Sequence, residues 1–440
     1  MTPRKKAFLL LEDIIINTRY SNLALKAQLS ERYSKEDRAF ITSLVYGTLD
    51  KLINIDYIID QFAKGRVQLK VRNILRIGVY QILYMDKVPD YSACDESVEL
   101  AKDAGKGALT GFINGVLRNI IRSKDNIKYP DKSIDPAAYL SAKYSFPKEL
   151  VKELIEDYGF AESEALLSYE PEYNSAVRIN TEVISVEEFL HALDSRQISY
   201  SKGKFFDDLV YLKGNGIFDT ELFTLGKCSI QGEASMMAVQ ALEPKKGQRV
   251  LDACAAPGGK TVYIAQLIEA GQVVALDRHA HRVELIIANA TRCGCERLIN
   301  AICADSSEFL SGLGEFDRVL VDAPCSGLGV LGAKPEIKNT INIETLKELE
   351  MLQSKILQTA AQYCKKDGIL VYSTCTFRKN ENQKIVDEFL KNNKQFSLDS
   401  LEGHLSSALA NHDLSSGLIQ LMPNIDGVDG FFIARMRRNA

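Results

Sequence analysis

The sequence predicts a multidomain protein with an all-α region at residues 1–128, a small α+β module at 129–230 and an α/β domain with a mostly parallel sheet at 231–440. Three observations predict this architecture. The first region has helical periodicity and almost no strand signal. Pro130 and Pro136 then mark a change of composition that is typical of a linker. In the last region, short apolar strands alternate with helical segments, which is the pattern of a parallel sheet.

The composition is that of an ordinary globular protein. Of 440 residues, 46% are hydrophobic and 25% are charged, and no apolar run reaches the roughly 18 residues that a membrane helix needs. Nine cysteines at irregular spacing indicate reduced thiols, and five scattered histidines offer no zinc site. We therefore expect a cytoplasmic protein with no membrane segment and no metal, acting as a monomer.

Charge is unevenly distributed along the chain. Residues 1–128 carry 21 Lys/Arg and 15 Asp/Glu, a net charge of +6, so the rest carries −10 because the whole chain is −4. Arg72 and Arg76 share one face of a predicted helix, and Arg118 and Arg122 share a face of another. Such a basic face could contact the phosphates of a nucleic acid, and it could equally be a solvated surface.

The module at 129–230 shows mixed helix and strand signals and no evident chemistry. Pro147 opens a predicted helix, since proline is favoured near a first turn. Ser185 and Glu188 form a capping-box pattern that starts a second helix. Apolar runs such as Leu209–Leu212 predict short strands.

The α/β domain contains five predicted strands, which are Arg249–Asp252, Gln272–Asp277, Asn300–Asp305, Arg318–Asp322 and Gly368–Thr374. The first four of these strands end in aspartate. Because ligands of open α/β sheets bind at the carboxyl ends of the strands, we expect these carboxylates to surround a ligand. The alternative is that each aspartate is an incidental turn residue.

The loop after the first strand favours S-adenosylmethionine over ligands that carry phosphate. The dinucleotide pattern G-x-G-x-x-G is absent, and Cys254 occupies the place of the first glycine in a G-x-x-x-x-G-K-[ST] loop. S-adenosylmethionine has a sulfonium, an ammonium, a ribose diol and an adenine. Asp277 is placed to accept the ribose hydroxyls, Asp305 to meet the adenine amine and Asp322 to meet the ammonium.

Two cysteines follow two of the strands. Cys325 lies three residues after Asp322, and Cys375 directly follows Thr374. If the two strands are neighbours, both thiols face one cleft. A thiolate that adds to carbon 6 of cytosine makes carbon 5 able to attack a methyl sulfonium, and such a thiol needs a depressed pKa. The alternative for each cysteine is simple packing, because cysteine is often buried.

Several segments resemble known families. In residues 1–128, Leu75-Arg-Ile-Gly-Val-Tyr-Gln81 and Phe112-Ile-Asn-Gly-Val-Leu-Arg-Asn119 resemble the NusB-like RNA-binding domain. The motifs DACAAPGGKT at Asp252, DAPCSGLG at Asp322 and STCT at Ser373 resemble the RNA cytosine-5 methyltransferase family. With both parts together, the chain resembles the Sun/Fmu branch of that family, whose members act on 16S ribosomal RNA.

This resemblance implies a class I, Rossmann-like methyltransferase domain with a seven-stranded sheet that ends in an antiparallel strand pair. It implies that Cys375 is the nucleophile and that Cys325 helps to release the product. Lys260 and Asp322 would also touch the target cytosine, and RNA would meet the protein at Arg72, Arg76, Arg118 and Arg122. The residues implied to bind S-adenosylmethionine are Cys254, Ala255, Ala256, Pro257, Gly258, Gly259, Lys260, Asp277, Asp305 and Asp322.

One departure and three rival interpretations stay open. The family usually has Gln-Asp before the sheet, whereas this chain has Gln231-Gly232-Glu233. A DNA cytosine-5 methyltransferase would need the tripeptide Glu-Asn-Val after its nucleophile, and the chain lacks it. A transfer-RNA methyltransferase of the same family would share the chemistry. A non-catalytic NusB-like RNA-binding factor would share the helical region, but it would have no use for both thiols.

Overall fold

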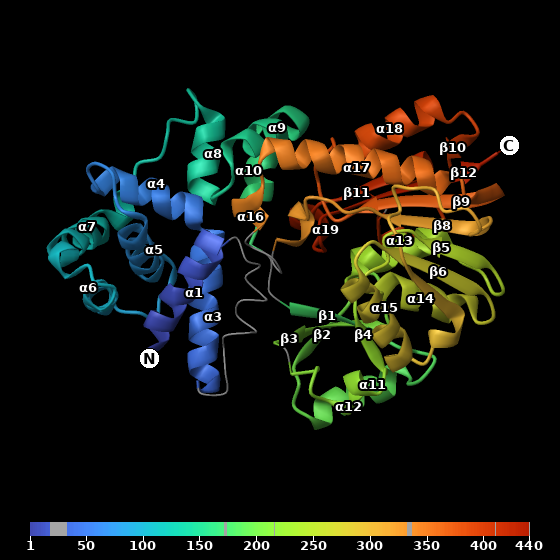
Figure 1. The fold of residues 1–440 in the computed structure, drawn as a ribbon, viewed down its shortest axis with the longest axis horizontal. Helices are drawn as coiled ribbons and strands as arrows, with labels where there is room; N and C mark the ends of the chain where they lie inside the picture. The colour runs from blue at the N-terminus through green and yellow to red at the C-terminus, as the bar shows by residue number, and fades with distance from the viewer. Residues whose placement is uncertain (18–32, 171–173, 215, 332–336, 410, 440) are drawn as a thin grey trace. The chain divides into compact units, whose positions relative to one another are not determined.

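The computed structural model describes residues 1–17, 33–170, 174–214, 216–331, 337–409 and 411–439. They form two compact units (Figure 1). Unit 1 comprises Met1–Ser168 and Lys334–Ile343, and unit 2 comprises Tyr169–Ala333 and Glu344–Ala440. No helix among the described residues combines the length and the apolar character that crossing a membrane requires.

Unit 1 is all-α, as the helical periodicity of its sequence predicts. Within the described part of residues 1–123, buried leucine, isoleucine and valine side chains from six helices form one apolar core. The Ser34 hydroxyl accepts a hydrogen bond from the backbone N–H of Asp37 and so caps α3. The helices are α1 (Pro3–Asn17), α3 (Lys35–Asp50), α4 (Leu52–Phe62), α5 (Leu69–Tyr84), α6 (Asp90–Asp103), α7 (Thr110–Ser123), α8 (Pro136–Tyr144), α9 (Lys148–Tyr158), α10 (Phe160–Ser168) and α16 (Ile337–Thr340).

Residues 129–168 pack with unit 1, although the sequence grouped them with the following module. The side-chain amide of Asn54 in α4 donates to the Ala142 carbonyl in α8 at 2.8 Å. The Ser145 hydroxyl accepts a hydrogen bond from the backbone N–H of Ile53 at 3.0 Å. These buried bonds attach α8 to α4, so the compact unit ends at Ser168 and not at the proline-marked linker.

Unit 2 begins with the small module, a four-stranded antiparallel sheet in the order β2-β3-β1-β4. The predicted capping box is present at the start of α11, because the Ser185 hydroxyl accepts from the Glu188 N–H and the Glu188 carboxylate accepts in return. The elements are β1 (Asn174–Ile179), α11 (Val186–Ser195), β2 (Tyr200–Lys202), β3 (Leu209–Lys213), α12 (Glu221–Thr224) and β4 (Cys228–Ile230).

The rest of unit 2 is the predicted α/β domain, with the strand order β10-β12-β9-β8-β5-β6-β7 and β11 paired to β12. The five strands β5–β9 are parallel, and the antiparallel pair of β11 with β12 at the end of the chain is as predicted. The strands are β5 (Arg249–Asp252), β6 (Gln272–Asp277), β7 (Ile299–Cys303), β8 (Phe316–Asp322), β9 (Cys364–Thr374), β10 (Phe396–Leu398), β11 (Leu418–Leu421) and β12 (Phe431–Arg438).

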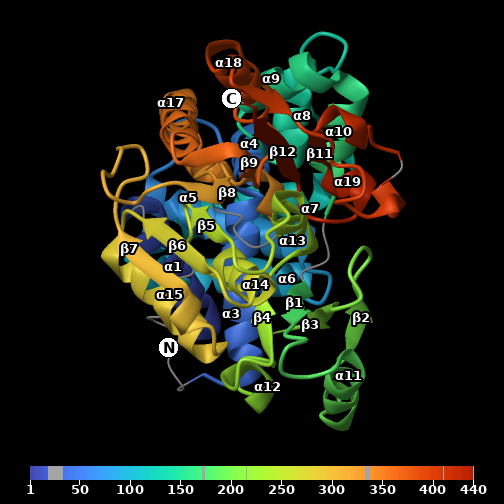
Figure 2. The ribbon, with the colours of Figure 1, turned by 90° about the vertical axis from the view of Figure 1, so that its right-hand side faces the viewer.

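Helices cover both faces of this sheet (Figures 1 and 2). Alternate residues of each strand point to opposite faces, so Val250 and Leu320 pack with α13 and α14, whereas Leu251 and Val319 pack with α17 and α18. The fold class predicted from the sequence is therefore confirmed. The helices are α13 (Glu233–Leu242), α14 (Gly259–Ile268), α15 (Ala280–Arg292), α17 (Ile343–Ala361), α18 (Gln383–Asn392) and α19 (Pro423–Asp426).

Candidate active site

The two strands that precede the predicted thiols are neighbours in the sheet. Strands β8 and β9 pair in parallel, with Asp322 opposite Ser373. Their carboxyl ends therefore lie at the same edge, and the chain carries Cys325 and Cys375 into adjacent loops there. The two Sγ atoms are 3.3 Å apart, and both side chains are half-buried. The two thiols therefore meet, as expected for neighbouring strands, but neither cysteine is among the residues that line the cavity described next.

A cavity of about 240 Å³ opens at this edge of the sheet. Most of its wall comes from the small-residue loop between β5 and α14 and from the segment before α13. Of the predicted cofactor residues, seven line it, and Gly258, Asp277 and Asp305 do not. The lining residues are Ile230, Gln231, Gly232, Ser235, Asp252, Cys254, Ala255, Ala256, Pro257, Gly259, Lys260 and Asp322.

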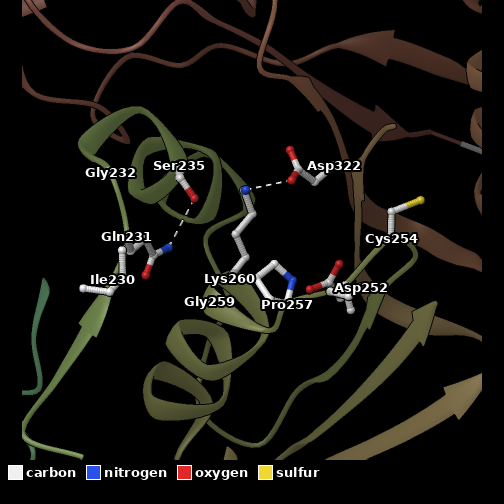
Figure 3. Close-up of a pocket in the computed structure, with 12 residues that line it drawn as sticks. Ile230, Gln231, Gly232, Ser235, Asp252, Cys254, Pro257, Gly259, Lys260 and Asp322 are labelled. Carbon is white, nitrogen blue, oxygen red and sulfur yellow. Dashed lines mark hydrogen bonds and ion pairs between the residues drawn. The ribbon is translucent and has the colours of Figure 1, made fainter. Parts of the chain in front are cut away.

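An ion pair crosses the cavity (Figure 3). Lys260 extends from the first turn of α14, and its Nζ lies 2.7 Å from the Asp322 carboxylate at the end of β8. The Ser373 hydroxyl donates to the other oxygen of Asp322 at 2.9 Å. Burial acts to lower the pKa of the Lys260 ammonium, but Asp322 outweighs it, with a smaller contribution from Cys375, so the net pKa is raised. The Lys260 ammonium therefore stays positively charged at the cavity.

Asp252 offers an unsatisfied acceptor at the cavity wall. Its side chain is buried, and one carboxylate oxygen accepts a hydrogen bond from the Thr261 hydroxyl at 2.7 Å. Its Oδ1 has no hydrogen-bond partner among the described residues. Burial, with a contribution from the charge of Asp322, raises the pKa of Asp252 to about 6. A buried orphan acceptor favours a ligand that donates hydrogen bonds, which the ammonium and ribose hydroxyls of S-adenosylmethionine do.

The loop that holds this wall needs glycine at its end. Gly258 caps α14 with φ +105°, and a Cβ there would lie 3.1 Å from the Cα of Ile286. The small side chains of this loop allow a ligand to approach the backbone closely. Burial raises the pKa of Cys254 well above the usual thiol range, so this cysteine is an inert member of the wall.

Two predicted cofactor acids lie outside the cavity wall. Asp277 ends β6, is buried, accepts from the His279 N–H at 3.0 Å and pairs with Arg282 at 3.3 Å. Asp305 lies just after β7 and is exposed, and hydrogen bonds from the backbone and hydroxyl of Ser307 lower its pKa. Both acids follow strands that end at the same edge of the sheet as Asp252. Neither lines the cavity, so their contact with the cofactor stays a prediction.

At position 232 this chain has glycine where the family usually has aspartate, and another acid lies close to that place in the structure. Glu233 turns away from the cavity, because its buried carboxylate accepts from the Phe205 N–H at 2.6 Å and the Tyr211 hydroxyl at 2.8 Å. A Cβ on Gly232 would lie 2.9 Å from the Asp429 Oδ2. An acid from the loop before β12 therefore stands where a side chain at position 232 would project. The sequence did not predict that Asp429 lies beside Gly232, since the two residues are 197 positions apart in the chain.

The pKa of the Cys325 thiol depends on its contact with Cys375. Its hydrogen bond with Cys375 and its burial raise the pKa of Cys325 well above the usual thiol range, and the charge of Glu381 adds to the effect. The two thiols therefore influence one another's protonation. Which of them is the nucleophile and which is the helper stays a prediction.

The predicted basic helix faces differ from one another. Arg72 and Arg76 do share a face of α5, but that face meets Asp56 of α4, which lies 3.3 Å from Arg72 and 2.5 Å from Arg76. Arg76 is buried, so the phosphate contact predicted for it is contradicted by its ion pair inside unit 1. Arg118 and Arg122 of α7 are exposed, and each hydrogen-bonds to an asparagine of the same helix. The described residues contain no cluster of groups suited to a metal ion.

Comparison with known proteins gives matches for both parts of the chain. Residues 1–122 match the NusB family, and residues 239–437 match the family described as 16S rRNA methyltransferase RsmB/F. A relative from Bacillus subtilis (strain 168), described as probable ribosomal RNA small subunit methyltransferase B, is 38% identical over 96% of this chain and 95% of its own.

Two solved structures share the fold. A methyltransferase homologue from Pyrococcus horikoshii is 27% identical, with a TM-score of 0.57 over 69% of this chain and 99% of its own. NSun6 from the same organism, solved with SFG, has a TM-score of 0.61 at 21% identity over 68% of this chain and 99% of its own. Because its sequence identity is only 21%, the match with NSun6 shows a shared fold and nothing more.

Proposed function

Because this chain belongs to the 16S rRNA methyltransferase RsmB/F family, we propose that it methylates carbon 5 of one cytosine in 16S ribosomal RNA through a covalent bond between Cys375 and the base. Family membership makes the chain a methyltransferase of ribosomal RNA with a NusB-like domain at its front. The observation that carries the finer proposal is the 3.3 Å contact of two thiols at the ends of adjacent parallel strands.

The cavity fits S-adenosylmethionine as the methyl donor. The unsatisfied Oδ1 of Asp252 and the carboxylate of Asp322 would accept hydrogen bonds from the hydroxyl and ammonium groups of the cofactor. The small side chains of the loop before α14 would let the cofactor approach the protein backbone. Asp277 and Asp305, at the ends of the next two strands, would complete the set. When bound, this cofactor supplies a methyl group on a positively charged sulfur.

The two thiols divide the remaining chemistry. The Cys375 thiolate forms a bond to carbon 6 of cytosine, and the displaced electron pair makes carbon 5 the nucleophile for the methyl group. After a base removes the carbon-5 proton, the bond to carbon 6 breaks and Cys375 leaves as a thiolate. Cys325, whose sulfur lies 3.3 Å away, can donate a hydrogen bond to that departing sulfur and so help the product to leave. Lys260 stabilises negative charge on Cys375 throughout.

The target base must leave its stack to reach these thiols, because a cytosine inside a helix does not expose carbon 6 to a nucleophile. Lys260 and Asp322, which meet across the cavity, are the groups we assign to the edge of the extruded base. Arg118 and Arg122 on the NusB-like unit remain candidates for phosphate contacts.

Transfer of a labelled methyl group tests this proposal. The protein and labelled S-adenosylmethionine are incubated in three parallel reactions, one with 16S ribosomal RNA, one with transfer RNA and one with DNA. We expect label in 16S ribosomal RNA alone, recovered as 5-methylcytosine at one position that loses its mark in a deletion strain. Label in transfer RNA only would instead support the transfer-RNA enzyme, and no label in any of the three would support a non-catalytic RNA-binding factor.

A further inference from the structure

A fully buried carboxylate lies next to the two thiol loops and has no part in the mechanism above. Glu381 stands between β9 and α18, and its side chain is 0% exposed. Burial of a charge costs free energy unless the charge is paired and hydrogen-bonded. The partners of Glu381 therefore indicate what this arrangement provides.

The carboxylate of Glu381 bonds to the loop of each thiol. Its Oε2 accepts a hydrogen bond from the backbone N–H of Ser326 at 2.8 Å, and Ser326 directly follows Cys325. Its Oε1 accepts from the Arg378 guanidinium at 2.9 Å, and Arg378 lies three residues after Cys375. One side chain thus connects two loops that are 50 residues apart in the sequence.

Two further contacts strengthen this connection. The Gln353 amide of α17 donates to Glu381 Oε2 at 2.9 Å and to the Pro324 carbonyl at 2.9 Å, so the Cys325 loop is bonded on both sides of the thiol. The hydroxyls of Ser326 and Thr376 are hydrogen-bonded at 2.9 Å, which ties the two loops directly.

We propose that Glu381 is the positioning residue of the thiol pair, and that its carboxylate holds the Cys325 loop against the Cys375 loop so that both sulfurs reach the same base. The inference rests on the proposed function, because it assigns both thiols to one reaction. Glu381 does not line the cavity, so it acts on the thiols through the loops that carry them.

The charge of Glu381 gives this role a second observable. The hydrogen bond with Cys375 and burial raise the pKa of Cys325, and the Glu381 carboxylate raises it further. Replacing the carboxylate with a neutral amide should therefore lower the pKa of Cys325. A residue that only filled space would not change the titration of a neighbouring thiol.

The test compares Glu381→Gln with Glu350→Gln in the full-length protein. Glu350 binds the same Arg378 guanidinium, at 2.8 Å, but makes no contact with the Cys325 loop. We expect Glu381→Gln to lower kcat about 100-fold, since a displacement of about 1 Å in a catalytic group has that effect, with an unchanged KM for S-adenosylmethionine. It should also shift the pH profile of Cys325 alkylation by iodoacetamide, followed by mass spectrometry, to lower pH. Glu350→Gln should leave kcat within about threefold.

Two results for kcat and for the alkylation profile would contradict the inference. Wild-type kcat and wild-type alkylation in Glu381→Gln would overturn it, as would equal losses in Glu350→Gln, which would mean that pairing of Arg378 is the only role. If Glu381→Gln does not fold, Gln353→Met replaces it, because it removes the bonds from Gln353 to Glu381 and to the Pro324 carbonyl in the Cys325 loop. A smaller loss of kcat in the same direction is then expected, and wild-type kcat would overturn the inference. Absence of methyl transfer by the wild type would refute the proposed function, while the alkylation profiles would still test Glu381.

Discussion

The Sγ atoms of Cys325 and Cys375 lie 3.3 Å apart at the ends of two parallel strands. Their loops are further joined by the backbone of Gly329, whose N–H donates to the Cys375 carbonyl at 2.9 Å. The charge of Lys260 interacts with Cys375, and the charge of Glu381 contributes to the raised pKa of Cys325. The two thiols therefore differ in their electrostatic surroundings although they touch.

Cys375→Ala should abolish methyl transfer, with a loss of about a thousandfold or more, because it removes the thiol that we assign to the bond with carbon 6. The affinity for S-adenosylmethionine should remain unchanged, since Cys375 does not line the cavity. Calorimetric titration of the variant with the cofactor checks this. Lost cofactor binding, or retained turnover, would contradict the assignment.

Lys260→Met should impair both stability and activity. It removes the partner of Asp322 in a largely buried ion pair, which should lower the free energy of unfolding by about 2 kcal/mol, because the remaining charge is left unpaired. Urea unfolding measures the loss, and adding Asp322→Asn should recover part of it. Lys246→Met, which breaks an exposed pair with Glu269, is the matched control and should leave the unfolding midpoint unchanged.

Asp252→Asn should change how stability depends on pH. Burial raises the pKa of Asp252 from 3.8 to about 6, so the folded protein holds this proton more tightly than the unfolded chain. The contribution of Asp252 to stability is therefore fully present below about pH 4 and is lost as pH rises through about 6, by about 3 kcal/mol. The amide can still accept from Thr261 without a charge.

Unfolding by urea at a series of pH values checks this prediction. The stability of Asp252→Asn relative to the wild type should rise between about pH 4 and pH 6 and then level off. Parallel curves for the two proteins would show that the carboxyl does not titrate as its buried position requires.

Gly329→Ala should disrupt the thiol loops. A Cβ on Gly329 would lie 1.8 Å from the Gly430 carbonyl oxygen, a backbone atom that cannot move aside cheaply. We expect a loss of about 2 kcal/mol in stability and a marked loss of kcat. Gly115→Ala in α7 is the control, because nothing lies within 4 Å of its Cβ and alanine favours a helix by up to about 1 kcal/mol. Thermal unfolding of both variants should give shifts of opposite sign.

The α/β domain and its thiol pair could be predicted because their signals are local. A strand that ends in aspartate, followed by a break, has the same appearance wherever it lies, and parallel connectivity then brings the strand ends to one edge. Asp322 and Lys260 belong to such motifs. Their 2.7 Å ion pair follows from that connectivity.

Other features could not be predicted because they depend on packing. Helical periodicity places Arg72 and Arg76 on one face, but it does not show that Asp56 of α4 covers that face. The position of Asp429 beside Gly232 depends on the loop before β12, far away in the chain. Glu381 lies in a polar stretch whose composition is typical of an exposed loop, and only its buried partners show its connection to both thiols.

Denaturing gel electrophoresis of Cys325→Ala incubated with 16S ribosomal RNA and S-adenosylmethionine tests the central claim most directly. We assign Cys325 to the release of the product, because its thiol is placed to donate a hydrogen bond to the departing Cys375 sulfur, so without it the bond to carbon 6 should persist. We predict a stable protein–RNA adduct in Cys325→Ala that is absent in the Cys325→Ala/Cys375→Ala double variant. Free RNA alone in both lanes, with methyl transfer by Cys325→Ala at the wild-type rate, would contradict the proposed division of roles between the two thiols.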